Sequence, residues 1–205
     1  MDLQADLIAY YEAEAAGGLR TEHARAMRLE LRSAFAEVLV DGGVRTVLDV
    51  GAGPGRDTAL WQADGFDVVG LDLAHGNAER MRQRGIRSVA GSLFELPFRS
   101  QAFGALWTMS TFVHVPHDRF DEAMRELLRV VGPGAPLGIG TWGGRDFEGV
   151  VEFGELRPYR FFSLASHDRW REMLARHATV EEFRTFEATT ADGWEYQFAV
   201  VRAPG

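Results

Sequence analysis

The sequence predicts an α/β protein with a doubly wound, mostly parallel sheet and helices on both faces. Apolar stretches of strand length alternate with helical patterns and are joined by short turns, which is typical of right-handed crossovers in a parallel sheet. The apolar stretch from Val47 to Val50 runs into a turn that contains Gly51, Gly53 and Gly55. Near the end of the chain, two strand-like segments flank an Asp-Gly pair, which predicts an antiparallel hairpin at the C-terminal edge of the sheet.

Two helices are expected before the first strand. Residues 2–19 show a short helical pattern, in which Tyr10 and Tyr11 either close over a pocket or pack as ordinary helix residues. From Thr21 to Leu39, apolar residues recur at helical spacing and predict an amphipathic helix on one face of the sheet. We expect residues 1–40 to supply N-terminal helices or a lid.

The segments that follow alternate between strand and helix as a doubly wound sheet requires. They are expected at residues 47–50 (strand), 58–64 (helix), 66–72 (strand), 74–84 (helix), 86–90 (strand), 103–109 (strand), 118–131 (helix) and 136–142 (strand). In such folds, ligands bind beyond the carboxyl ends of the strands.

The segment after the fifth expected strand lacks clean periodicity. Residues 143–162 mix Gly, Pro and aromatic residues, so we expect a long loop there and interpret residues 143–165 as a lid over a substrate. A helix capped by Ser166 or His167 is expected next. The closing hairpin is expected to pair residues 179–188 with residues 194–201 through a turn at residues 189–193.

Composition restricts the chemistry. The 205 residues, 46% hydrophobic and 25% charged, predict a single globular domain over residues 1–205. The chain has no cysteine and no lysine, which excludes thiolate nucleophiles, Cys-based zinc sites, Schiff-base lysines and a P-loop lysine. The histidines show no metal-ligand spacing, so we expect no metal.

Charge and hydropathy indicate the kind of partner and the compartment. A net charge of −8 argues against a nucleic-acid partner and favours a small molecule. No apolar run is long enough to span a bilayer, and the first residues lack the basic and apolar regions of a signal peptide. We therefore expect a cytoplasmic monomer or homodimer with no membrane partner.

The glycine turn indicates a nucleotide-like ligand. Its spacing is D-x-G-x-G-x-G from Asp49, and the next predicted strand ends in an acid, Asp72. A dinucleotide fingerprint, G-x-G-x-x-G, would have a third glycine where this chain has Arg56. This departure makes a nicotinamide-dependent oxidoreductase the weaker alternative.

With four further motifs, the chain resembles the class I S-adenosylmethionine-dependent methyltransferases over roughly residues 20–140. The motifs lie at residues 49–55, 68–72, 91–98, 103–110 and 129–134. The resemblance implies a seven-stranded, Rossmann-like sheet and S-adenosylmethionine as the cofactor. The cofactor residues that it implies are Asp49, Gly51, Ala52, Gly53, Gly55, Asp72, Leu73, Ser92, Leu93 and Ser110.

Each part of the cofactor has an implied partner. Asp49 and the glycine backbone would hold the methionine part, and Asp72 would accept hydrogen bonds from the ribose hydroxyls. Ser92 and Leu93 would flank the adenine. Ser92 is a departure, because many relatives have an acid there, and a hydroxyl is a weaker, uncharged acceptor.

The loop after the fourth strand holds the candidate for proton transfer. His114 either takes a proton from the acceptor or caps a helix and packs near the adenosine. The predicted substrate residues are Thr111, His114, Trp142, Arg160 and Phe161. Aromatic side chains beside an arginine either enclose a planar or anionic substrate or belong to the core under a loop.

Methyl transfer from S-adenosylmethionine to a small molecule by in-line displacement is the function that the resemblance implies. Such a reaction depends mainly on alignment and exclusion of water. Two alternatives remain open: a non-catalytic module that binds S-adenosylmethionine or S-adenosylhomocysteine, and an NAD(P)-dependent oxidoreductase.

Overall fold

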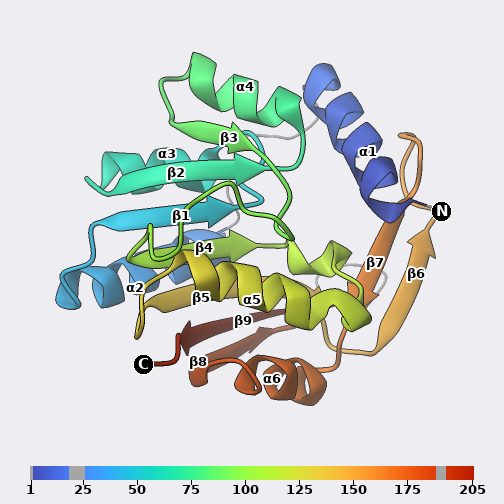
Figure 1. Ribbon diagram of the computed structural model, residues 1–205. Helices are drawn as coiled ribbons and strands as arrows, with labels where there is room; N and C mark the ends of the chain where they lie inside the picture. Colours follow the sequence, from blue (N-terminus) through green and yellow to red (C-terminus); the bar gives the residue numbers. More distant parts are fainter. Residues whose placement is uncertain (1, 19–25, 188–192) are drawn as a thin grey trace.

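The structure is a computed structural model that describes residues 2–18, 26–187 and 193–205. Its main sheet has, within these residues, seven strands in the order β3-β2-β1-β4-β5-β9-β8 (Figure 1). The strands of this sheet are β1 (Thr46–Val50), β2 (Asp67–Asp72), β3 (Ser88–Ala90), β4 (Ala105–Met109), β5 (Pro136–Gly143), β8 (Thr179–Phe186) and β9 (Glu195–Arg202). The helices are α1 (Leu3–Gly17), α2 (Ala26–Asp41), α3 (Arg56–Ala63), α4 (His75–Gln83), α5 (Phe120–Val130) and α6 (His167–Ala175), with short 3-10 helices η1 (Phe112–His114) and η2 (His117–Arg119).

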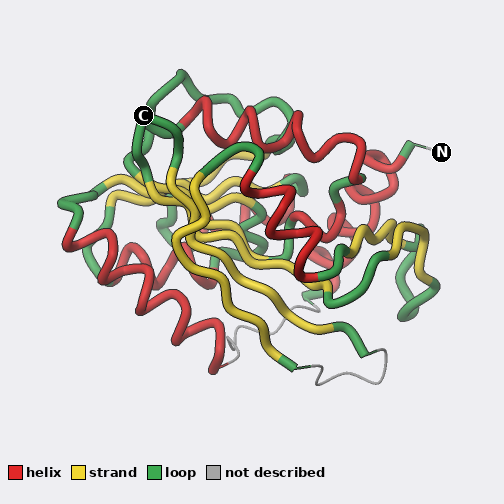
Figure 2. Tube along the Cα trace, turned by 90° about the horizontal axis from the view of Figure 1, so that it is seen from below, coloured by secondary structure: helices red, strands yellow, loops and turns green. Residues whose placement is uncertain are grey.

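The predicted doubly wound sheet is confirmed. Strands β3, β2, β1, β4 and β5 pair in parallel, and β9 pairs antiparallel with both β5 and β8. Figure 2 shows the twisted strands with helices on both sides. The predicted turn at residues 189–193 lies outside the described residues except for Gly193.

Alternating side chains of the central strands build one core on each face of the sheet. Leu48 and Leu106 pack in the core beneath α5 and α6, whereas their neighbours Val47 and Trp107 pack in the core beneath α2 and α3. Asp49, on β1, therefore has the same parity as Val47 and points towards the α3 face.

The chain reverses its winding direction at β1, which has β2 on one side and β4 on the other. Crossovers diverge from this point, so a crevice opens beyond the carboxyl ends of the two strands. Helix α1 lies across this end of the sheet, and the arrowheads of β1 and β2 point towards it (Figure 1). Of the predicted helix at residues 21–39, residues 21–25 lie outside the described part.

The prediction of a long loop after β5 is wrong. Strands β6 (Phe147–Val151) and β7 (Arg160–Leu164) form a separate antiparallel pair within residues 143–165. Their register is continuous, with Phe147 opposite Leu164 and Val151 opposite Arg160. The hairpin places β7 beside α1 and η1, so the paired strands form a wall next to the crevice.

Among the described helices, none is long and apolar enough to cross a bilayer.

Candidate functional site

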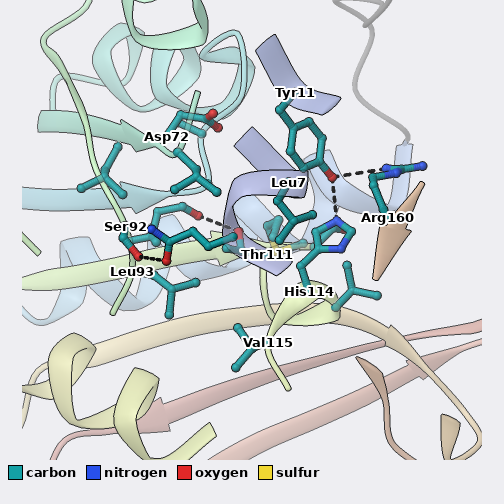
Figure 3. Close-up of a pocket in the computed structure, with 18 of the residues that line it drawn as sticks. Leu7, Tyr11, Asp72, Ser92, Leu93, Thr111, His114, Val115 and Arg160 are labelled. Carbon is teal, nitrogen blue, oxygen red and sulfur yellow. Dashed lines mark hydrogen bonds between the residues drawn. The ribbon is translucent and has the colours of Figure 1, made fainter. Parts of the chain in front are cut away.

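A cavity of about 730 Å³ lies at the carboxyl ends of β1, β2 and β4. This volume falls within the roughly 300–1,000 Å³ of typical small-molecule sites. Segments distant in the sequence contribute its walls: the turn after β1, the end of β2, residues 91–94, residues 109–116 and the inner side of α1. Figure 3 shows these side chains converging on one space.

The turn after β1 is held against the loop after β4. Gly51 has φ +73°, and a Cβ atom there would lie 1.9 Å from Thr111 Oγ1. The Thr111 hydroxyl in turn donates to the Val50 carbonyl at 3.0 Å. Glycine is therefore required at position 51 by the backbone conformation and by the neighbouring loop, while Gly51 and Ala52 still line the cavity.

Asp72 is fixed at the cavity wall. Its Oδ2 accepts from the Gly53 N–H at 2.7 Å, and its Oδ1 accepts from the Ala74 N–H at 2.9 Å and from Asn77 Nδ2 at 3.1 Å. A carboxylate has about four acceptor positions. These bonds leave about one of them for a ligand hydroxyl and hold the group in one orientation.

Three predicted cofactor residues, Asp49, Gly53 and Gly55, do not line the cavity. Gly53 instead holds Asp72. Gly55 has φ +81°, and a Cβ there would meet Met81 Cγ at 2.5 Å, so this glycine is required where α3 packs against α4.

Asp49 lies beneath the turn and is only 1% exposed. Its Oδ2 accepts from the Thr58 hydroxyl at 2.6 Å, whereas its Oδ1 has no hydrogen-bond partner among the described residues. Burial, and then the negative charge of Asp57, raise the pKa of the Asp49 carboxyl to about 7. This buried oxygen leaves one acceptor below the turn for a donor that the described residues do not supply.

Ser92 and Leu93 line the cavity at the end near Asp72 (Figure 3). The Ser92 hydroxyl accepts from the Phe94 N–H at 3.2 Å and lies 3.4 Å from Gln4 Oε1 on α1. The first turn of α1 therefore covers this end of the cavity.

His114 is the last residue of η1, and both of its ring nitrogens are hydrogen-bonded. Nδ1 lies 2.7 Å from the Phe161 carbonyl oxygen, which can only accept, so Nδ1 carries the proton. Nε2 then accepts from the Tyr11 hydroxyl at 2.6 Å, and that hydroxyl also accepts from Arg160 Nη1 at 3.2 Å (Figure 3).

Most of the predicted substrate residues meet at this end of the cavity. Thr111, His114, Trp142 and Arg160 line it, but Phe161 does not. Phe162 occupies the wall instead, because side chains alternate along β7. Ser110 also lines the cavity; it has φ +65°, and its hydroxyl lies 3.1 Å from the Tyr196 hydroxyl.

Sequence reasoning did not assign Tyr11, Arg28 and Tyr196 to the site, although all three line the cavity. Arg28 Nε donates to Asp57 Oδ2 at 2.7 Å, which connects α2 to α3. Tyr10 and Tyr11 did raise the question of a helix that closes over a pocket. Tyr11 faces the cavity, and nothing comparable in the sequence marked Arg28 or Tyr196.

Comparison with known proteins agrees with this geometry. Residues 47–134, from β1 to the turn after α5, match a family model described as a methyltransferase domain. The chain belongs to the class I S-adenosylmethionine-dependent methyltransferases. Within this methyltransferase domain, the matched segment contains the glycine turn, Asp72 and His114.

Two relatives show similarity beyond that segment. A probable chloroplastic tocopherol O-methyltransferase from Oryza sativa is 32% identical over 162 residues, which are 73% of this chain and 43% of the relative. A 2-methyl-6-phytyl-1,4-hydroquinone methyltransferase from Synechocystis is 32% identical over 163 residues, which are 72% of this chain and 49% of the relative. The chain spans less than half the length of these curated relatives.

A solved structure supports the fold of the methyltransferase domain. The 1,6-didemethyltoxoflavin-N1-methyltransferase of Burkholderia thailandensis, solved with bound 1,6-didemethyltoxoflavin and S-adenosylhomocysteine, superposes with a TM-score of 0.75 at 21% identity. The superposition covers 98% of this chain and 88% of that structure.

Proposed function

We propose that this chain transfers a methyl group from S-adenosylmethionine to a small-molecule acceptor by in-line displacement. One observation carries the proposal: a single continuous cavity has the glycine turn and Asp72 on one side and Tyr11, His114 and Arg160 on the other. One region suits a nucleoside and the other a second, smaller molecule.

The cofactor side of the cavity has the polar groups that a nucleoside with an amino acid tail requires. Asp72 keeps an acceptor position for a ribose hydroxyl, and Leu93 supplies an apolar surface for a flat base. The bare backbone at Gly51 and Ala52 permits close approach of the tail. Asp49 Oδ1 is buried and has no hydrogen-bond partner among the described residues. It suits the ammonium group of the tail, which would be connected to it by a water molecule or by direct contact past the turn.

When bound, S-adenosylmethionine supplies an electrophilic methyl group: the acceptor–methyl bond forms as the sulfur–methyl bond breaks, sulfur keeps the electron pair, and the acceptor loses a proton. The protein's part is alignment and exclusion of water. Helix α1 covers the cavity, and the β6–β7 hairpin closes its side. We further propose that the chain is a single domain in which residues 1–40 and 143–165 cover the site.

The acceptor region favours a small planar molecule. Trp142, Phe162, Tyr11 and Tyr196 supply flat walls. The two relatives are named for tocopherol and for 2-methyl-6-phytyl-1,4-hydroquinone, which supports a ring-containing acceptor. The net charge of −8 supports a site without a nucleic-acid partner. We further propose a cytoplasmic enzyme that acts as a monomer or homodimer.

Calorimetric titration tests the cofactor. We expect heat of binding with S-adenosylmethionine and S-adenosylhomocysteine and none with NAD. Binding of NAD alone would overturn the proposal in favour of an oxidoreductase.

A non-catalytic binding module is the second candidate, because both ring nitrogens of His114 are bound within the protein. Product formation from S-adenosylmethionine with phenols, carboxylic acids and amines distinguishes the two candidates. Tight cofactor binding with no methylated product across the panel would favour the module.

A further inference from the structure

Arg160 stands at the acceptor end of the cavity among aromatic rings. It is the first residue of β7 and is half-buried. Its guanidinium carbon lies 4.3 Å from the centre of the Tyr10 ring and 5.0 Å from that of Phe162. Nη1 donates to the Tyr11 hydroxyl at 3.2 Å.

No ion pair in the described part of the chain involves Arg160. Two other arginines of the same cavity do have acidic partners: Arg28 pairs with Asp57 at 2.7 Å, and Arg119 pairs with Glu122 at 2.8 Å. Asp72, an acid of the cavity lining, lies on the other side of Tyr11 from Arg160 in Figure 3.

A half-buried guanidinium without an anion has unused binding capacity. The group carries five N–H donors, and within the described residues a single hydrogen bond to Tyr11 uses one of them. Contacts with ring faces offset part of the charge but satisfy no in-plane donor. Two oxygens of a planar anion match the guanidinium fork and form stronger hydrogen bonds than neutral acceptors do.

The net charge of the chain differs in sign from the charge at Arg160. The chain is acidic, with a net charge of −8, so its average surface does not attract anions. The Arg160 cation, which faces the cavity, therefore favours a ligand with a negative charge beside β7. Of the rings around Arg160, Tyr11 and Phe162 line the cavity and suit a flat substrate.

We propose that the acceptor is a carboxylate-bearing aromatic molecule, anchored by a two-point contact of its carboxylate with Arg160. The inference rests on the proposed function and names the substrate class of that site. The carboxylate anchors the acceptor and is distinct from the atom that receives the methyl group. The neighbouring Tyr11 and His114 then face the ring and its remaining substituents.

The test compares matched pairs of compounds that differ in charge and little in shape. The protein is first saturated with S-adenosylhomocysteine, and calorimetry then measures the binding of para-hydroxybenzoate against para-hydroxybenzamide and of para-hydroxyphenylacetate against its amide. We expect at least one acid to bind about 10-fold or more tightly than its amide, because a hydrogen bond to a charged group is worth more than a neutral one.

Two variants on the same hairpin connect the preference to one residue. Arg160→Gln keeps a polar side chain but loses the charge, and we expect the preference for acids to fall to about 2-fold or less, with Arg160→Lys intermediate. Arg157→Gln is the matched control, because Arg157 is exposed, stacks on Tyr159 at 3.7 Å and does not line the cavity. The control should keep the full preference.

Each result of these measurements either supports the proposal or contradicts it. Equal binding of acids and amides, no binding of any acid, or a preference that survives Arg160→Gln would overturn the proposal. If Arg160→Gln does not fold, the wild-type pairs and Arg160→Lys still test it. Failure to bind S-adenosylhomocysteine in the first step would instead overturn the proposed function and is recorded before any acceptor is added.

Discussion

At the scale of single residues, the two acids at the ends of neighbouring parallel strands play different parts. Asp72 is the last residue of β2 and faces the cavity, whereas Asp49 is the penultimate residue of β1 and points beneath the turn. Asp49 lies opposite Gly70, two residues before Asp72, so the two side chains are on the same face of the sheet and Asp72 lies closer to its carboxyl edge. The position along the strand accounts for the difference. One acid is therefore available to a ligand directly, and the other is buried with a perturbed pKa.

Replacing Asp72 should weaken cofactor binding. Asp72→Ala removes the remaining charged acceptor at the cavity wall, and we expect the binding of S-adenosylhomocysteine to weaken by about 1.5–3 kcal/mol in calorimetry. Asp67→Ala, at the exposed start of the same strand, is the control and should leave the affinity unchanged. Equal affinities for wild type and Asp72→Ala would refute the contact with the ribose.

Asp49 should make stability depend on pH. The pKa of its carboxyl is raised from 3.8 to about 7 in the folded protein. Between these values the folded state keeps a proton that the unfolded state has released, so this group's contribution to the free energy of unfolding falls as pH rises and levels off above pH 7.

Asp49→Asn removes that contribution. Urea unfolding at a series of pH values should show the variant gaining stability relative to wild type as pH rises from about 4 to 7, by at most about 1.4 kcal/mol per pH unit. A difference that is independent of pH would mean that the carboxylate is charged in the folded protein throughout this window.

At the scale of elements, α1 is joined to both sides of the cavity that it covers. Glu12 accepts from the N–H groups of His75 and Gly76 at the start of α4, at 2.6 and 3.1 Å. Arg80 on α4 donates to the Ala15 carbonyl at 3.0 Å. On the other side, Tyr11 contacts His114 and Arg160, so the helix bridges α4 and β7.

Loosening one end of this bridge should expose the cavity. Glu12→Gln removes a negative charge from the N-terminus of α4, where helix N–H groups favour one by about 0.3–1 kcal/mol. We expect faster hydrogen exchange of the α1 amides and weaker binding of S-adenosylhomocysteine. Glu79→Gln, an exposed acid on α4, should change neither measurement. Unchanged α1 exchange in Glu12→Gln would show that this contact does not hold the helix.

At the scale of the whole molecule, the parallel half of the fold was predictable, because its strands are short apolar runs and all but β4 end at, or just before, a glycine or an acid. The β6–β7 hairpin was not. Its strands pair with each other outside the main sheet, and the segment Phe147–Val151 includes a glycine and alternates only between half-buried and exposed positions. The edge of a domain imposes little pattern on its sequence.

The cavity was predictable only in part for a related reason. Gly51, Asp72 and Leu93, which line the cavity, each lie within one short continuous motif of the sequence. The contact between Tyr11 and His114 joins residues 103 positions apart. A pairing at that distance leaves no periodicity in either segment, so it becomes visible only in the folded chain.

Ligand binding should stabilise the whole domain, because the cavity draws on β1, β2, β4 and α1 together. S-adenosylhomocysteine at about 100 times its dissociation constant should raise the free energy of unfolding by about 2.7 kcal/mol. Urea unfolding with and without the ligand measures this, with NAD as the control ligand. An unchanged midpoint at saturating ligand would mean that the ligand binds the folded and unfolded chains equally.

The contacts of Gly51 and Gly55 also bear on how this motif persists in evolution. Each glycine is required by a neighbour within the protein, Thr111 in one case and Met81 in the other. A descendant that had lost its ligand would still be under selection to keep both glycines, because replacing either would disrupt folding. In sequences of this kind, loss of activity should therefore be sought first at Arg160, which faces the cavity and makes a single hydrogen bond among the described residues.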